Sequence, residues 1–283
     1  MGKIKFKFID LFAGIGGFHI AMSNIGGNCV FASELDAHAR KTYIHNFDIN
    51  EKDFNHDITK MNIKKIPEFD VLCAGFPCQP FSQAGKKRGF DDHRGNLFFN
   101  IADIINKKKP NAFFLENVRG IRSHDYGNTF ATIKDIIENG LGYSFYSKII
   151  KASDFGLPQL RPRTFMVGFK NDNDKSFEFP LPQEKLKYNM SEVLNGKCSR
   201  EIGFTLRVGG RGSKITDRRN WDSYYVDGKV VRIGPKEGLK MQGFPENFNM
   251  PVSQTQAMKQ LGNSVAVNAV QAVGKKIIEY IKW

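Results

Sequence analysis

The feature that most restricts the fold is a regular alternation of strand-like and helix-like segments over about the first 170 residues. Such an alternation predicts a doubly wound α/β sheet with helices on both faces. The segments typical of buried strands are 4–12, 28–35, 69–75, 111–116, 143–150 and 163–169, and those typical of helices are 18–27, 36–47, 96–110 and 129–140.

The pattern changes after Phe169. Residues 170–185 are polar and contain two prolines, as expected of a boundary. Residues 195–250 are rich in glycine, arginine and aromatic residues without a clear helical period, and predict a small, irregular, partly β module. Residues 264–283 show a helical apolar stripe, which we expect to pack back on the main sheet. The pattern therefore predicts an α/β domain at 1–171, a small irregular module at 172–253 and a returning C-terminal helix at 254–283.

Cysteine usage and apolar content restrict the class of protein. The four cysteines, Cys29, Cys73, Cys78 and Cys198, form no CxxC pair, which argues against a disulfide framework and a structural zinc site. We therefore expect no metal and a reducing, cytosolic compartment. With 41% hydrophobic residues the chain can bury a core, yet no apolar run approaches a membrane span, and we expect no signal peptide.

The formal net charge of +13 suggests a polyanionic partner, with nucleic acid first. A lysine-rich solvated surface explains the charge equally well. Charge alone leaves both interpretations open.

A glycine-rich turn follows the first predicted strand. In "DLFAGIGG" the residues Gly14, Gly16 and Gly17 allow a tight turn and close approach of a ligand to the backbone. No Lys-Ser/Thr pair follows, so a P-loop is excluded. Glu34 ends the second strand, where nucleotide-binding sheets place an acid on the ribose hydroxyls. Together these residues predict a nucleoside-containing cofactor, either a dinucleotide or S-adenosylmethionine.

A cysteine lies in a loop that two prolines restrain. In "AGFPCQPFSQAG" Pro77 and Pro80 fix the backbone on either side of Cys78. Glu116 ends another predicted strand and is expected to face the same crevice. A thiol beside a carboxyl group suits nucleophilic addition with acid assistance. Arg161 and Arg163 begin the next strand, where they can bind a phosphate or orient Glu116.

At this point the chain resembles a known family. From Phe8 to about Val270 it carries, in order, the motif set of the DNA cytosine-5 methyltransferases. The blocks are "FIDLFAGIGGFHIA", "GFPCQPFSQAGKKRGF", "RGNLFFNIADII", "FFLENVRGI", "LPQLRPRTFMVGF", "MQGFPENF" and "QLGNSVAVNAV".

The resemblance implies a set of catalytic roles. Cys78 would add as a thiolate to C6 of cytosine, and Glu116 would bind the N3 edge and the exocyclic amine. Arg161 would support this site, with Arg163 as its neighbour. C5 would then take a methyl group from S-adenosylmethionine, leaving S-adenosylhomocysteine.

The resemblance also implies the cofactor contacts. Glu34 would bind the ribose, Leu35 would pack on the adenine, and Asn263 would help to close the pocket. The full set is Phe12, Gly14, Gly16, Gly17, Glu34, Leu35, Asp57, Ile58, Gly75, Pro77, Leu97, Asn263, Ser264 and Val265.

Double-stranded DNA is the implied substrate, with the target cytosine flipped out of the stack. The loop after Cys78 would close over the DNA, and the module would read the sequence, since Arg200–Lys240 holds ten basic and five acidic residues. Trp221, Tyr224 and Tyr225 are expected in the core of that module. The residues expected to contact DNA are Ser82, Lys86, Lys87, Arg88, Thr205, Arg207, Gly209, Gly210 and Arg211.

Three alternatives remain. A tRNA cytosine-5 methyltransferase shares the scaffold, but such enzymes typically carry Cys-Phe-Thr where this chain has Gly203-Phe204-Thr205. A catalytically silent DNA-binding protein would not need Cys78 and Glu116. A nicotinamide-dependent oxidoreductase leaves the Pro-Cys-Gln loop without a role. The favoured interpretation is a monomeric modification enzyme of the bacterial cytosol or a phage-infected cell, and a restriction endonuclease is its expected functional partner.

Overall fold

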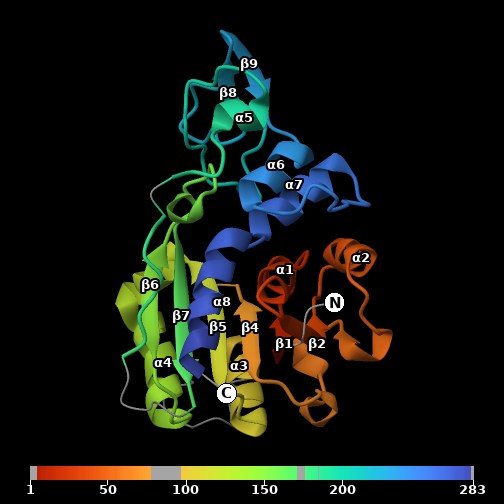
Figure 1. Cartoon of the computed structure of the whole chain (residues 1–283), viewed down its shortest axis with the longest axis vertical. Helices are drawn as coiled ribbons and strands as arrows, with labels where there is room; N and C mark the ends of the chain where they lie inside the picture. The colour runs from red at the N-terminus through yellow and green to blue at the C-terminus, as the bar shows by residue number, and fades with distance from the viewer. Residues whose placement is uncertain (1–4, 78–96, 171–175, 184, 282–283) are drawn as a thin grey trace.

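The computed structural model describes residues 5–77, 97–170, 176–183 and 185–281. A seven-stranded sheet in the order β3-β2-β1-β4-β5-β7-β6 forms the centre of the main body (Figure 1). Its strands are β1 (Phe6–Leu11), β2 (Gly27–Ser33), β3 (Phe54–Asn55), β4 (Val71–Gly75), β5 (Ala112–Val118), β6 (Tyr146–Ile150) and β7 (Arg163–Phe169).

Helices cover both faces of this sheet. One apolar core includes residues of α1 and α8 with one face of the strands, and a second includes residues of α3 and α4 with the other face. This arrangement confirms the predicted doubly wound α/β class. The α-helices are α1 (Gly17–Ser23), α2 (Ala37–Asn46), α3 (Leu97–Lys108), α4 (Asn128–Asp135), α5 (Met190–Leu194), α6 (Pro235–Gln242), α7 (Gln254–Asn263) and α8 (Val267–Ile281). Shorter helical turns are η1 (Glu51–Asp53), η2 (Ile58–Lys60), η3 (Ile63–Lys65), η6 (Arg119–Arg122), η7 (His124–Gly127), η8 (Ile136–Gly140) and η9 (Ser153–Phe155).

Strand direction determines what meets at the edge of the sheet. β1 pairs in parallel with β2 and β4, β2 with β3, and β4 with β5, so their carboxyl ends lie at one edge. β7 pairs antiparallel with β5, with Val118 opposite Arg163. The start of β7 therefore lies beside the end of β5, at the edge where ligands bind in such sheets.

The region after β7 contains more helix than its sequence indicated. It holds α5, the hairpin of β8 (Ser223–Val226) and β9 (Lys229–Arg232), and α6. The expectation of no helix between 195 and 250 is wrong, because α6 forms there. Its signals are Pro235 in the first turn, the Glu237 carboxylate accepting from the Gly234 amide at 2.8 Å, and Gly243 in a left-handed conformation after the last turn.

The last part of the chain forms two helices. α7 precedes the predicted helix, and the backbone leaves the helical conformation at Ser264 before α8 begins. α8 packs against α1 and β5, with Val270, Val273 and Ile277 fully buried. Figure 1 shows α6 and α7 between the β8–β9 hairpin and the sheet. In the part of the chain that the structure describes, no helix is both long and apolar enough to cross a bilayer.

Aromatic residues fill the interior of the irregular module. Trp221 and Tyr224 are each 1% exposed, as expected of core residues. Tyr225 is 46% exposed, so its assignment to the core is wrong. The strand period explains the difference, because neighbouring residues in β8 point to opposite faces.

Candidate active site

The glycine-rich turn between β1 and α1 lines a cavity through Gly14. Phe12, Gly14 and Gly16 all have positive φ, at 55°, 56° and 87°. A Cβ atom on Gly14 would meet nothing within 4 Å, whereas one on Gly16 would overlap the Phe47 ring. One on Gly17 would lie 2.6 Å from Cγ2 of Val265. Gly14 therefore leaves open space for a ligand, and Gly16 and Gly17 allow close packing.

Glu34 holds this turn in place. Its carboxylate accepts hydrogen bonds from the backbone N–H groups of Gly14, at 2.8 Å, and Asp36, at 2.7 Å. Burial raises the pKa of Glu34, and these two amides act against that rise. Asp36 also caps α2, because its carboxylate accepts from the amides of His38 and Ala39.

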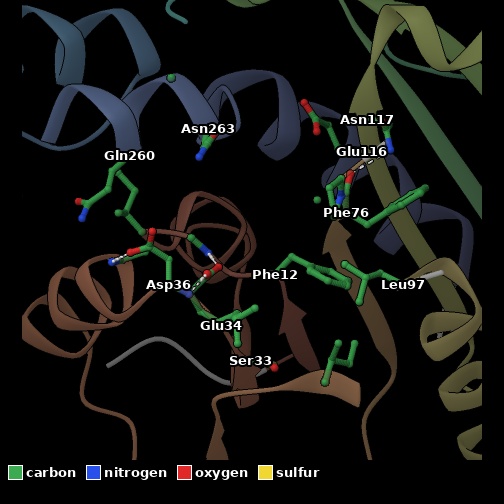
Figure 2. Close-up of a pocket in the computed structure, with 18 of the residues that line it drawn as sticks. Phe12, Ser33, Glu34, Asp36, Phe76, Leu97, Glu116, Asn117, Gln260 and Asn263 are labelled. Atoms are coloured by element: carbon green, nitrogen blue, oxygen red, sulfur yellow. Dashed lines mark hydrogen bonds between the residues drawn. The ribbon is translucent and has the colours of Figure 1, made fainter. Parts of the chain in front are cut away.

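One cavity of about 750 Å³ runs from this turn to the end of β5. Figure 2 shows Glu34 and Asp36 on one side of it and Glu116 and Asn117 on the other. Leu35 lines it and is 70% exposed. The predicted cofactor residues that line this cavity are Phe12, Gly14, Glu34, Leu35, Asp57, Ile58, Gly75, Pro77, Leu97 and Asn263. The predicted residues outside its lining are Gly16, Gly17, Ser264 and Val265.

A charged pair closes the other end of the cavity. Nε of Arg163 lies 2.9 Å from Oε1 of Glu116, and Glu116 is only 7% exposed. Both residues line the cavity. The pair leaves a carboxylate facing the cavity with a permanent cation beside it.

Asn117 joins the end of β5 to the loop after β4. Its Nδ2 donates to the carbonyl oxygen of Phe76 at 2.9 Å, and its Oδ1 accepts from the Val118 amide at 2.8 Å. The side chain is buried. Asn117 therefore holds the backbone two residues before Cys78, a role that its sequence position beside Glu116 did not reveal.

Outside the residues that the structure describes lie Cys78 and the predicted DNA contacts Ser82, Lys86, Lys87 and Arg88.

Arg161 occupies a different environment from Arg163. It is 1% exposed, and its guanidinium donates to the carbonyl oxygens of Leu206, at 3.1 Å, Gly262, at 3.0 Å, and Ser264. Arg163 is thus the arginine whose side chain contacts Glu116, while Arg161 binds backbone carbonyls behind the cavity wall.

Most of the predicted DNA-reading residues in the described module make contacts within the chain. Thr205 Oγ1 accepts from the Arg161 amide at 3.1 Å, and the Gly209 carbonyl accepts from the Trp221 indole at 2.9 Å. Arg211 donates to the Ile233 carbonyl at 3.2 Å, beside a buried aspartate. Arg207 and Gly210 are exposed.

The cavity also has polar residues that sequence reasoning missed. Lys259 Nζ lies 3.2 Å from Asp36 Oδ2, and Thr42 Oγ1 donates to Gln260 Oε1 at 2.9 Å. These contacts join α7 to α2 beside the cavity. Their positions within "MKQLGNS" were visible, but nothing in the sequence identified their partners. Among the described residues no cluster of three or more His, Cys, Asp or Glu side chains suits a metal ion.

The doubly wound sheet and the cavity with a Glu–Arg pair at its carboxyl edge define an α/β protein with a ligand-binding cleft where open sheets of this kind bind their ligands. The family model "C-5 cytosine-specific DNA methylase" matches residues 6–203 and 199–279. The Type II methyltransferase M.HpaII of Haemophilus parainfluenzae is 43% identical over 97% of this chain and 90% of its own. The Type II methyltransferase M.DsaV of Dactylococcopsis salina is 42% identical over 99% of this chain and 88% of its own. M.HhaI of Haemophilus parahaemolyticus is 39% identical over 96% of this chain and 94% of its own.

The chain therefore belongs to the C-5 cytosine-specific DNA methylase family and is an enzyme of that family. Solved structures agree on the fold. The Dnmt2 methyltransferase of S. pombe superposes with a TM-score of 0.73 at 18% identity, covering 99% of this chain and 100% of its own. A protein described as a putative DNA modification methyltransferase from an E. coli prophage superposes with a TM-score of 0.71 at 22% identity, covering 96% of this chain and 98% of its own.

Proposed function

We propose that this enzyme transfers a methyl group from S-adenosylmethionine to C5 of a flipped-out cytosine in double-stranded DNA. The observation that carries the proposal is the single cavity that joins the Gly14–Glu34 turn to the Glu116–Arg163 pair. A donor bound at one end and a base bound at the other would share one cavity. Proximity of this kind accounts for a large part of the acceleration of a two-substrate reaction.

The described residues fit a sulfonium nucleoside. Gly14 leaves room beside the backbone, Glu34 offers a carboxylate to the ribose, and exposed Leu35 and buried Ile58 offer apolar surface to a purine. The volume of about 750 Å³ lies in the range of small-molecule sites. When bound, S-adenosylmethionine would supply an electrophilic methyl group, and the chain would supply position and exclusion of water.

The other end of the cavity suits activation of cytosine. We infer that the Cys78 thiolate forms a bond to C6 while Glu116, protonated at this step, gives its proton to N3. This addition makes C5 nucleophilic. After methylation, C5 gives its proton to solvent, N3 returns its proton to Glu116 and the thiolate departs, which restores the aromatic ring. Arg163 would orient Glu116 and lend positive charge to the site.

The relatives and the charge support a proposal about the biological setting. The named relatives are Type II methyltransferases, and the net charge of +13 favours a DNA partner. We propose residues 172–253 as the target-recognition domain, a monomeric enzyme in the bacterial cytosol or a phage-infected cell, and a paired restriction endonuclease.

A transfer assay tests this function. The purified chain is incubated with S-adenosylmethionine labelled in its methyl group and with either duplex plasmid DNA or total tRNA. The proposal predicts labelled 5-methylcytosine in the DNA and none in the tRNA. Label in tRNA alone would establish the competing RNA activity, and label in neither would refute the proposal.

A further inference from the structure

A buried polar cluster lies behind the cavity wall and has no part in the chemistry described above. It consists of Gln159, Arg161 and Gln242, which we call the junction. Their exposed fractions are 0%, 1% and 0%. Buried amide and guanidinium groups are costly unless hydrogen-bonded, so their partners indicate what such a cluster holds together.

One side of the junction binds the segment that leads into the exposed Arg207. Gln159 Oε1 accepts from the Leu206 amide at 2.8 Å, and Arg161 Nη1 donates to the Leu206 carbonyl at 3.1 Å. The Arg161 amide adds a bond to Thr205 Oγ1 at 3.1 Å. Both backbone polar groups of Leu206 are therefore held by junction side chains.

The other side binds the end of α7. Arg161 Nη2 donates to the carbonyls of Gly262, at 3.0 Å, and Ser264, while Gln242 Nε2 donates to the Leu261 carbonyl at 2.6 Å. Gln159 Nε2 in turn donates to Gln242 Oε1 at 3.3 Å, which makes the cluster continuous.

The two bound segments also touch directly. A Cβ atom on Gly262 would lie 2.6 Å from the carbonyl carbon of Arg207, so only glycine permits this approach. Gly262 and Asn263 line the cavity beside Gly14 and Glu34. The wall of the cofactor end and the backbone that presents Arg207 are thus one packed unit.

We propose that Arg161 and Gln159 are positioning residues that set the recognition segment at Leu206–Arg207 and the cofactor-facing end of α7 in a single arrangement. Target choice and cofactor affinity then depend on the same buried hydrogen bonds. Among the residues that the structure describes, the cavity lining includes neither side chain, and the cation paired with Glu116 is Arg163. Gln159 and Arg161 therefore act through the segments that they hold. This inference rests on the proposed function.

The test uses two variants and a matched control in the full chain. Arg161→Lys keeps the charge but cannot reach three carbonyls at once, and Gln159→Leu keeps the size but removes the acceptor for Leu206. Ile137→Ala opens a cavity in the core on the other side of the sheet, away from the junction. For each protein the melting temperature, the Kd of S-adenosylhomocysteine and the selectivity among DNA sites are measured. Selectivity is the ratio of kcat/KM on the preferred site to that on single-base variants.

The two junction variants should raise the Kd and lower the selectivity together, each by about tenfold or more. Ile137→Ala should lower the melting temperature and leave both quantities unchanged. The inference is overturned if the junction variants match Ile137→Ala, or if only one of the two quantities moves. A wild-type chain that binds S-adenosylhomocysteine but methylates no DNA would instead refute the proposed function.

Discussion

Arg163 lies with its guanidinium Nε 2.9 Å from the Glu116 carboxylate because β7 runs antiparallel to β5. A parallel strand at this position would place its carboxyl end there. The reversal brings the first residue of β7 to the edge where β5 ends, so the acid and its cation come from adjacent strands. Rigid strands hold such a pair more accurately than loops do.

Glu116→Gln should slow methyl transfer by about two orders of magnitude or more, the range expected for loss of a general acid. The amide keeps the shape of the side chain but cannot give up a proton to N3. Single-turnover transfer to DNA measures the effect, and the Kd of S-adenosylhomocysteine serves as control because Glu34 and Leu35 remain. An unchanged rate would remove Glu116 from its proposed role.

Asn117→Ala should lower the single-turnover rate by about tenfold or more while Glu116 stays intact. The change removes the donor to the Phe76 carbonyl, a buried hydrogen bond whose loss costs about 1–3 kcal/mol, and frees the chain just before Cys78. Asn268→Ala is the matched control, since Asn268 Nδ2 also donates to a carbonyl, that of Phe155, at 3.2 Å. Equal rates in the two variants would contradict the proposed positioning.

Arg207→Ala should affect the choice of DNA target, whereas Arg211→Ala should affect the stability of the fold. Arg207 is exposed, so its removal should relax target choice with little change in melting temperature. Arg211 Nε lies 3.7 Å from the fully buried Asp222, which also faces Arg232 at 3.2 Å. Its removal should lower the melting temperature, because it weakens the pairing of a buried charge. Methylation of a library of DNA sites measures target choice, and thermal unfolding measures the melting temperature. If Arg207→Ala lowered the melting temperature and Arg211→Ala only relaxed target choice, the two roles would be reversed.

Asp10→Asn should change how stability depends on pH. Asp10 is fully buried in β1, and burial raises its pKa well above the usual value. The folded state therefore keeps the proton while the unfolded chain releases it from about pH 4 upward, so this group makes folding less favourable as pH rises. The variant should gain unfolding free energy relative to wild type between about pH 5 and pH 8. Urea unfolding of both proteins across this pH range measures the difference in their unfolding free energies. The titration of nearby His19 largely cancels in that difference. If the two curves of unfolding free energy against pH ran parallel, Asp10 would be ionised in the folded state.

The sequence predicted the parts of this molecule that depend on local periodicity and turn chemistry. The strands and flanking helices of the sheet and the Gly14 turn follow from patterns within a few residues. The junction did not follow, because Gln159 and Gln242 are 83 residues apart and their pairing depends on tertiary packing. The sequence also placed Arg161 and Arg163 in one role. Their surroundings differ because β7 begins only at Arg163, while Arg161 lies before the strand with a φ of 28°, so the strand period does not relate the two side chains.

The most direct test is bisulfite sequencing of plasmid DNA from cells that express this chain or its Cys78→Ala variant. The proposed chemistry requires the thiolate to attack C6, so cytosines should resist conversion within one short motif, and only with the intact thiol. Protected cytosines that persist with Cys78→Ala would contradict the covalent mechanism. Unprotected DNA with the wild-type chain, shown to be folded and to bind S-adenosylhomocysteine, would contradict DNA methylation itself.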